Sequence, residues 1–435
     1  MCYAIPGKVK QLNGRRVTVD YFGRQKYALN ETKDLRPGDY VYVQGGYVLD
    51  KVPAAKAAAI LRDWRELFLE LEKIDAARSA LPREAVPTPV SRILLKTANG
   101  QKLNKADSLA LLDCRDKKDI DLLYRTANAI RHKHHDNSCC VHGVIEISNA
   151  CGQQCAYCGI SRQNLKIRRF RMSSRQILAA AKTAVKTYGF RSLVLQGAQD
   201  CGRPLKEIAQ VIREIKNTYA ALVFISLGEI GVAGLEMLFN AGARGLLMRF
   251  ETSNPRLYEK YRPGCKLSTR LAHLKKAQEL GYLLATGSLI GLPGQTTQDI
   301  WEDIALAVNL NPDMISLGPF ISHPQTTLAG SSSVTSQTIL KAMALARLIA
   351  APQSKILITT ALETLDPQAR ARGLEAGGSS LMLNATPLQY RKLYSIYPAR
   401  AHETESLAHQ IKETIALLAS LGRAPTDLGI NADAR

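Results

Sequence analysis

Short apolar runs alternate with longer amphipathic segments from residue 143 onward. The short runs are rich in β-branched and aliphatic residues, as buried strands are, and the longer segments repeat their apolar positions with a helical period. Eight runs predict strands, at Gly143–Ser148, Ser192–Gln196, Leu222–Ser226, Gly245–Arg249, Leu284–Ile290, Met314–Leu317, Ile356–Thr360 and Ser380–Leu383. Eight such β-α units predict an α/β fold, a closed (β/α)8 barrel with its active site at the carboxyl ends of the strands.

The first part of the chain has a different pattern. Short strand-like runs broken by glycine and by Pro37-Gly38 predict a small all-β, OB-like barrel, and a helix is expected after it over residues 54–74. Three prolines between residues 81 and 89 indicate a linker. We therefore expect a small domain over residues 1–75, a Pro-rich linker over 76–94 and the large barrel over 95–435, preceded by a helical layer at 95–135.

Composition places few limits on function. The chain has 435 residues, of which 46% are hydrophobic, and its nine cysteines are too few for a disulfide scaffold. Its first residues do not resemble a secretory signal, and no apolar run reaches membrane-spanning length. The sequence thus predicts a cytoplasmic protein without a membrane partner, whose thiols stay reduced.

The net charge of +20 is compatible with nucleic acid, with acidic proteins or with anionic small molecules. The basic stretches at 131–135 and 162–175 are not accompanied by a stacking-aromatic motif. Solvated helix faces and loops explain most such stretches, so nucleic acid is an unlikely partner, although a tRNA-modifying enzyme stays open as an alternative.

Three cysteines, Cys151, Cys155 and Cys158, stand within eight residues directly after the first predicted barrel strand. Iron-sulfur cubanes are normally held by four thiolates, so a compact triplet predicts a cluster with one iron open to another ligand. The alternative is structural zinc completed by His142 or a remote cysteine. Zinc knuckles usually pair two close ligand couples, and no second couple with that spacing is present. We therefore favour an iron-sulfur cluster.

The Cys-x3-Cys-x2-Cys spacing, with an aromatic residue at Tyr157, resembles the motif of the radical S-adenosylmethionine (SAM) superfamily. This resemblance implies a [4Fe-4S] cluster held by the three cysteines. It also implies that the open iron chelates SAM, which is cleaved to a 5'-deoxyadenosyl radical. A barrel interior is suited to shielding such a radical from water.

Further segments are similar to HydE, the radical SAM maturase family of [FeFe]-hydrogenase. The similarity covers about residues 100 to 425, with methylornithine synthase and biotin synthase as the nearest sibling families. The matching segments include 145–150, 169–172, 226–229, 247–255, 287–296, 318–324, 359–361 and 390–398. The resemblance implies that Arg249, Glu251 and Arg270 contact SAM, and that Met382 lies near its adenosyl group. An arginine fork suits the SAM carboxylate, although Arg249 and Glu251 could instead form a structural ion pair.

The same resemblance implies a substrate cavity lined by four late residues, Thr359, Thr360, Tyr394 and Tyr397. The chain also departs from the family. It has no cysteine after Cys265, so an auxiliary cluster is not expected. The turn at 196–200 lacks an acidic group that HydE proteins tend to have there, and Phe224 stands where HydE can have a small polar residue.

The first nine residues, Met1 to Val9, resemble the start of HypC, a small chaperone family of [NiFe]-hydrogenase maturation, and the match extends to about residue 75. The resemblance implies that Cys2 becomes a terminal thiolate that can bind iron, and that maturation proteins are candidate partners of this domain. A histidine that usually accompanies this cysteine is replaced by Gln44, a poor iron ligand. The domain could therefore serve only for docking.

Together these features predict a radical SAM enzyme of HydE type that acts on an iron-complex or sulfur-containing small precursor in metallocofactor assembly. One alternative within the same chemistry is an amino-acid mutase or synthase similar to methylornithine synthase. The alternative from another class is a non-enzymatic iron carrier in which Cys2 does the work.

Overall fold

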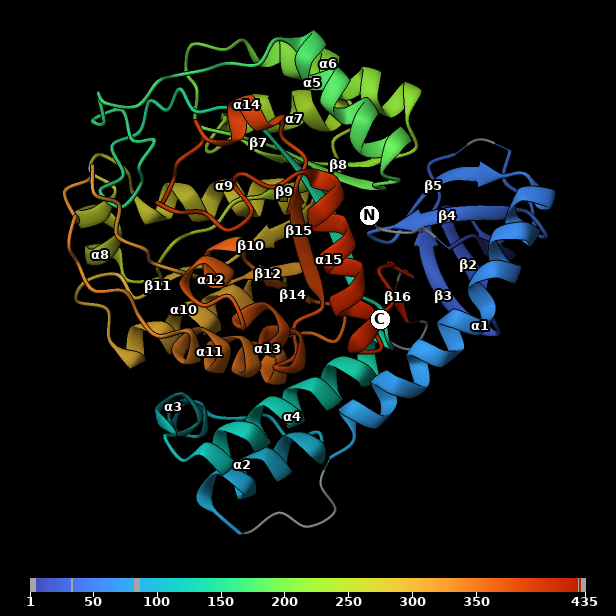
Figure 1. Cartoon of the computed structure of the whole chain (residues 1–435), viewed down its shortest axis with the longest axis horizontal. Coiled ribbons are helices and arrows are strands. Elements are labelled where there is room, and N and C mark those ends of the chain that lie inside the picture. The colour runs from blue at the N-terminus through green and yellow to red at the C-terminus, as the bar shows by residue number, and fades with distance from the viewer. Residues whose placement is uncertain (1–4, 33, 82–86, 429, 432–435) are drawn as a thin grey trace.

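The structure, a computed structural model, describes residues 5–32, 34–81, 87–428 and 430–431. It contains a small amino-terminal barrel beside a large parallel barrel (Figure 1). In the described part of the chain, no helix combines the length and the apolar character that a membrane span requires.

The amino-terminal barrel is a six-stranded sheet with the order β16-β3-β2-β1-β4-β5, and an additional β3–β5 pairing curls it. Apolar residues alternate along these strands, so that Val17 and Val19 of β2 point into its core with Phe68 of the helix α1. Its elements are β1 (Gly7–Asn13), β2 (Arg16–Tyr21), β3 (Arg24–Leu29), β4 (Tyr40–Gln44), β5 (Tyr47–Val52), α1 (Ala54–Ser79) and β16 (Ile430–Asn431). Because β16 comes from the other end of the chain, the two ends of the sequence share one sheet.

The large barrel is closed by eight parallel strands in the order β10-β12-β14-β15-β6-β7-β8-β9, which confirms the predicted fold class. Leu193 and Leu195 of the second strand, like most other aliphatic side chains of these strands, are fully buried. The strands are β6 (Cys140–Ser148), β7 (Ser192–Gly197), β8 (Leu222–Ser226), β9 (Gly245–Leu247), β10 (Leu283–Thr286), β12 (Met314–Ser316), β14 (Lys355–Ile358) and β15 (Ser380–Asn384).

Helices surround this barrel. Those that follow the strands are α5 (Ser174–Lys182), continued by a π-helical turn at Thr183–Thr187, α6 (Leu205–Thr218), α7 (Gly231–Asn240), α9 (Leu267–Glu279), α10 (Thr297–Asn309), α11 (Ser336–Ile349), α13 (Ala369–Glu375) and α15 (Leu407–Ser420). The helical layer before the barrel, expected over 95–135, begins earlier, inside the predicted linker. It consists of α2 (Pro89–Ala98), α3 (Lys105–Asp113) and α4 (Lys117–His135), which pack near α10 and α11 (Figure 1). Shorter elements at the strand ends are α8 (Pro255–Tyr261), α12 (Thr360–Leu365), α14 (Leu388–Arg391), β11 (Leu289–Ile290) and β13 (Gly318–Pro319).

Some predicted element ends were wrong for local reasons. The strand expected to reach Thr360 ends at Ile358, because the Thr359 hydroxyl accepts a hydrogen bond from Leu362 N and caps α12. Asp366-Pro367, a dipeptide typical of a helix start, precedes α13, which begins only at Ala369. The Asp366 side chain accepts from Gln368 N at 3.0 Å and forms a turn before the helix.

The small barrel packs against the amino ends of the large barrel's strands. The β4–β5 turn lies there: an added Cβ at Gly45 would be 2.7 Å from Leu222 Cδ2 and 3.0 Å from Leu283 Cδ1. Leu222 and Leu283 are the first residues of β8 and β10. One apolar cluster joins Tyr42 and Tyr47 of the small barrel to interior residues of the large one. The opposite end, at the strand carboxyl termini, is left for the site.

A buried ionic contact attaches the end of α1 to the large barrel. Asp75 of α1, whose side chain is 1% exposed, binds Arg131 of α4 at 2.7 Å and Arg423 after α15 at 2.8 Å. Arg131 belongs to the basic stretch at 131–135, and its side chain is fully buried. This part of the positive charge therefore serves internal packing of α1 against the barrel.

Candidate active site

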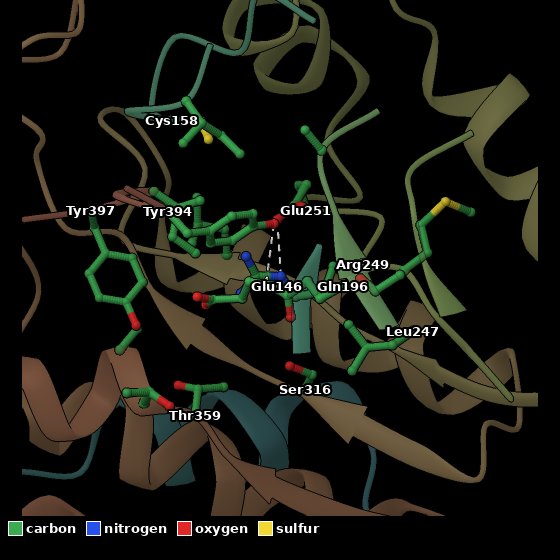
Figure 2. A pocket seen from close by; sticks show the side chains of 18 of the residues that line it. Glu146, Cys158, Gln196, Leu247, Arg249, Glu251, Ser316, Thr359, Tyr394 and Tyr397 are labelled. Carbon is green, nitrogen blue, oxygen red and sulfur yellow. Dashed lines mark hydrogen bonds and ion pairs between the residues drawn. The ribbon is translucent and has the colours of Figure 1, made fainter. Parts of the chain in front are cut away.

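A cavity of about 330 Å³ opens at the carboxyl ends of the barrel strands. Its lining includes Cys151, Cys155 and Cys158, which are carried by the loop that follows β6. Figure 2 shows Cys158 at one side of this cavity and Ser316 and Thr359 at the other. The cysteine loop therefore covers one side of a cavity that extends toward the middle of the barrel.

The cysteine loop is fixed by a single guanidinium group. Arg169 donates hydrogen bonds to the carbonyl oxygens of Asn149 at 2.8 Å, Ile160 at 2.6 Å, Ser161 at 2.6 Å and Asn164 at 3.0 Å. Five donors in a rigid fork allow one arginine to satisfy several carbonyls of an irregular loop. This part of the basic stretch at 162–175 is thus directed inward.

Backbone hydrogen bonds attach the same loop to neighbouring elements. Gly152 N donates to Gln199 O, Ala156 N to Tyr261 O and Gly159 N to Ile396 O, at 2.9 to 3.0 Å. The partners follow three different parts of the barrel. The positions of the cysteines are therefore set by the assembled barrel and not by the loop alone.

The thiol positions fit a cluster better than a single zinc ion. Among the described residues, the group whose metal-binding atoms all lie within 4.8 Å of one another is His402, Glu405 and Glu413, and the cysteine triplet is not such a group. A tetrahedral zinc–sulfur site, with bonds of about 2.3 Å, needs sulfur atoms roughly 3.8 Å apart. Thiolates that each bind a different iron of a cubane lie farther apart, so this donor set fits a [4Fe-4S] cluster.

Burial controls the protonation of these thiols. It raises the pKa of Cys155 and of Cys158, while the nearby Arg262 guanidinium acts in the opposite direction on Cys155. Without a metal the two groups are therefore neutral thiols, and metal binding displaces their protons.

Arg249 and Glu251 lie in the loop directly after β9, and both line the cavity. Arg249 Nε is 3.3 Å from Glu251 Oε2, so the two residues form an ion pair inside the cavity (Figure 2). Glu251 has a φ of 71°, an uncommon conformation for a residue with a side chain. Backbone hydrogen bonds with Gly287 and Leu289 hold it there, at 3.3 and 2.7 Å. Such strain is characteristic of functional sites.

A buried carboxyl group forms hydrogen bonds with the loop that carries Arg249 and Glu251. Asp303 of α10 accepts hydrogen bonds from Ser253 N, Ser253 Oγ and Thr252 Oγ1, and from Gln295 Nε2 at 2.8 Å. Burial raises the pKa of Asp303 to about 7, against the opposing effect of the hydrogen bonds from Ser253 and Thr252. The position of the Arg249–Glu251 loop is therefore linked to a group that titrates near neutral pH.

A second polar group lines the cavity next to the cysteine loop. Arg270 of α9 is 3% exposed, and its Nε is 2.8 Å from Glu229 Oε1. Arg262 lies 3.8 Å from the same oxygen and donates to Tyr157 OH at 3.5 Å. Tyr157, Arg262 and Arg270 line the same cavity, whereas Glu229 does not. The arrangement presents two guanidinium groups to the cavity, and Glu229 pairs with both of them from outside the lining.

The opposite wall of the cavity combines an ion pair with two tyrosines. Glu146 of β6 pairs with Arg400, and both lie within the cavity. Tyr394 OH accepts a hydrogen bond from Gln196 Nε2 at 3.4 Å, and Tyr397 stands beside it (Figure 2). Burial raises the pKa of both tyrosines, so they are neutral hydrogen-bonding groups.

The remaining expected residues also reach the cavity. Thr359, Thr360 and Met382 are among its lining residues. The barrel thus brings every expected site residue from 151 to 397 to one cavity. Cys2 lies outside the described residues.

The predictions from the sequence did not include four charged residues at the cavity. Glu146, Arg262 and Arg400 line it, and Glu229 pairs with Arg262 beside it. A signal existed for Glu146, because a carboxylate between Ile145 and Ile147 in a buried strand must have a partner. Arg400 follows the predicted tyrosines by only three positions, but nothing in the local sequence distinguishes it from a surface arginine.

The divergent turn at 196–200 is divided between two cavities. Gln196 and Gln199 line the main cavity, whereas Asp200 lines a smaller neighbouring one of about 240 Å³. Asp200 binds Arg171 at 2.6 Å and accepts from Ser148 Oγ at 2.7 Å. The acidic group of this turn is therefore engaged in supporting the loop. The polar side chains of this turn that line the main cavity are the uncharged Gln196 and Gln199.

Comparisons with known proteins agree with this arrangement. The sequence matches the radical SAM superfamily over residues 145–307 and the HupF/HypC family over residues 1–64. It is 26% identical to the 3-methylornithine synthase of Methanosarcina acetivorans, over 76% of this chain and 92% of that protein. The fold is shared with a crystal structure of methylornithine synthase, with a TM-score of 0.67 and 23% identity over 77% of this chain and 97% of the other.

A higher identity is found with a maturase. The [FeFe] hydrogenase maturase subunit HydE of Thermotoga maritima is 36% identical over 314 residues, which are 72% of this chain and 89% of that protein. Residues 1–64 match a separate family, HupF/HypC. Radical SAM enzymes use a [4Fe-4S] cluster and SAM, and the chain is a member of that superfamily, in the HydE family, with an added HupF/HypC domain.

Proposed function

We propose that this radical SAM enzyme acts in the maturation of a hydrogenase-type metallocofactor, on a small iron-bound or sulfur-containing precursor. The observation that carries the proposal is the single cavity that joins the three cysteines to Arg249, Glu251 and the tyrosine wall. The similarity to HydE supports the maturation role.

Cys151, Cys155 and Cys158 would hold the cluster at the cavity rim. Bound there, the cluster and SAM supply a 5'-deoxyadenosyl radical. The guanidinium of Arg249 provides parallel donors for the carboxylate of SAM, and Glu251 can accept from its amino group or ribose. The Arg270–Glu229 pair holds the neighbouring wall in place, and the Met382 side chain offers an apolar contact for the adenosyl group.

The deeper part of the cavity would take the substrate. Thr359, Thr360, Tyr394 and Tyr397 present neutral hydroxyl groups there, and burial keeps both tyrosines protonated. Neutral donors orient a small polar precursor without adding charge. The surrounding walls exclude water from a reactive radical.

The amino-terminal domain would contribute partners or iron. Its similarity to the HupF/HypC family supports contact with other maturation proteins, and Cys2 is the residue that would bind an iron complex as cargo. Gln44, which replaces the usual histidine, is 0% exposed at the junction with the large barrel. It is therefore not part of an exposed iron site.

The test is anaerobic reconstitution followed by incubation with SAM and a reductant. Release of 5'-deoxyadenosine, or of an adenosylated product, is expected from the wild type and not from Cys158→Ser. Cys114→Ser, which changes a cysteine that is not among the residues lining the cavity, is the matched control and should retain activity. Absence of any SAM cleavage by protein with a verified cluster would contradict the proposal and leave the iron-carrier alternative.

A second candidate function is an amino-acid mutase or synthase. The Glu146–Arg400 pair favours it, because a free amino acid carries one group for each of these side chains. The two functions differ in their products. Incubation with a mixture of free amino acids should consume none of them if the maturase proposal is correct, whereas SAM-dependent conversion of one would support the synthase.

A further inference from the structure

The smaller cavity beside the main one has its own set of charged and apolar residues. It has a volume of about 240 Å³ and lies between the carboxyl ends of β6, β7 and β8 and the helices α6 and α7, which pack against each other (Figure 1). The two cavities share the wall formed by residues 197–199. The apolar lining residues of the smaller cavity are Ile147, Leu205, Ile208, Leu227 and Ile230, and the charged ones are Asp200, Arg203 and Glu229.

Arg203 brings a buried cation to this cavity. Its side chain is 7% exposed, and its Nε and Nη1 atoms have no hydrogen-bond partner among the described residues. The half-exposed Glu207 is its ion-pair partner, but Glu207 Oε2 lies 3.7 Å from Nε, beyond hydrogen-bond distance. Burial lowers the pKa of Arg203, against the raising influence of Glu207 and Asp200. A buried charge without a close partner is costly, so this guanidinium points to an anionic ligand.

The two carboxylates of the lining have cations of their own. Asp200 accepts hydrogen bonds from Nε and Nη2 of Arg171, at 2.6 and 2.8 Å. Glu229 Oε1 is 2.8 Å from Nε of Arg270. Neither carboxylate makes a close ion pair with Arg203 in the described part of the chain. The lining therefore keeps one positive charge that a ligand can neutralise.

Two helix N-termini meet the same cavity. Leu205 is the first residue of α6, Ile230 immediately precedes α7, and both residues line the cavity. No described side chain caps the first N–H groups of either helix. The helices have 14 and 10 residues, and the uncapped N–H groups and the helix dipole attract an anion at such an end. The helix ends and Arg203 thus favour the same kind of ligand.

The lining also limits the charge and size of that ligand. Guanidinium groups and helix N-termini bind both carboxylates and phosphates. Asp200 and Glu229 would repel a phosphate dianion, whereas a single negative charge matches Arg203. The five apolar side chains suit a hydrocarbon body. Drug-sized ligands occupy pockets of about 300–1,000 Å³, so a cavity of about 240 Å³ takes a smaller molecule.

We propose that this cavity binds a small monocarboxylate with a short apolar chain, its carboxylate held by Arg203 and the N-termini of α6 and α7. Gln199 Oε1 accepts a hydrogen bond from Glu229 N at 3.2 Å, and Glu229 pairs with Arg270 of the main cavity. A ligand on this wall therefore lies next to the main cavity without occupying it. This inference does not depend on the proposed maturation role.

The test is a ligand-observed NMR titration of the full chain. The probes are the linear and branched monocarboxylates from acetate to hexanoate, the neutral amide isovaleramide and inorganic phosphate. We expect saturable binding of a branched acid such as isovalerate, and weaker binding of phosphate. Isovaleramide should bind about tenfold more weakly than isovalerate, because it lacks the charge that Arg203 pairs with. Arg203→Gln should raise the Kd for isovalerate by a similar factor.

Arg213→Gln removes an exposed arginine from the same helix α6 and is the matched control, with the Kd of the wild type. Ile230→Phe narrows the cavity without changing its charge. It should also weaken binding, which keeps the proposal testable if Arg203→Gln does not fold. Equal Kd values for Arg203→Gln and Arg213→Gln, or no carboxylate bound by the wild type, would overturn the proposal. Loss of binding in Arg249→Gln but not in Arg203→Gln would place the carboxylate in the main cavity and overturn it too.

Discussion

Arg400 Nη2 binds Glu146 Oε1 inside the cavity, although 254 positions of sequence separate the two residues. Their side chains are 8% and 1% exposed. Arg400 also donates to Tyr394 O at 2.5 Å, so the pair attaches the loop after α14 to the first barrel strand. The tyrosine wall of the cavity is therefore positioned by an ion pair that water does not screen.

Removing one partner of this pair should destabilise the protein more than removing both. Arg400→Met leaves a buried carboxylate without its cation, so we expect the free energy of unfolding to fall by about 3 kcal/mol. The double variant Glu146→Gln/Arg400→Met should recover more than half of that loss. Chemical denaturation of the four proteins measures both effects, and additive losses would contradict a direct interaction.

Arg249 should contribute to SAM binding through the geometry of its guanidinium. Arg249→Lys keeps the charge and loses the planar pair of donors, so we expect SAM affinity to fall about tenfold, which corresponds to about 1.4 kcal/mol. Equilibrium dialysis of the cluster-loaded protein measures the change. Arg125→Lys alters an exposed arginine on α4 and serves as the control. Equal SAM affinity of Arg249→Lys and wild type, at equal iron content, would remove Arg249 from the SAM site.

Stability should fall as pH rises toward neutrality because of Asp303. Its pKa in the folded protein is about 7, above the usual value of 3.8, so folding favours the protonated form. The stabilising contribution is complete below about pH 4 and is lost as pH rises through 7, with a total of about 4 kcal/mol. Unfolding free energies at pH 5 and pH 7.5 test this.

Asp303→Asn is the control for that pH dependence. It has no titrating group at this position, so the fall between pH 5 and pH 7.5 should be much smaller in the variant. The variant should also bind SAM less tightly, because the amide cannot accept from Ser253, Thr252 and Gln295 as the carboxyl does. An unchanged pH dependence in the variant would assign the effect to another group.

The regular pattern of strands made the large barrel predictable from the sequence. The interruptions within its strands were not predictable in this way. The run at 284–290 was expected as one strand, and it forms β10 and β11 instead. The break lies at Gly287, whose φ is 153° and where a Cβ would be 2.2 Å from Ser316 O. That close approach of two backbones exists only in the assembled barrel, and periodicity along one strand does not report it.

The site was predictable to the extent that its residues lie near strand ends. Cys151 and Arg249 follow directly from their strands, because parallel strands bring their carboxyl ends together. Arg400 and Arg262 reach the cavity from irregular segments whose path depends on tertiary contacts. The burial of Gln44 was likewise not predictable, since it results from docking of one barrel on the other.

The docking of the small barrel should depend on the absence of a side chain at residue 45. Gly45 and Gly14 have φ values of 58° and 61°, so alanine at either position incurs a similar conformational cost. At Gly14 an added Cβ meets nothing within 4 Å, whereas at Gly45 it would be 2.7 Å from Leu222 Cδ2. Overpacking of this kind costs about 1–3 kcal/mol. We therefore expect Gly45→Ala to lower the free energy of unfolding by about 2 kcal/mol more than Gly14→Ala, and to increase proteolysis of the segment between the domains. Equal losses in the two variants would show that the β4–β5 turn does not pack on the amino ends of β8 and β10.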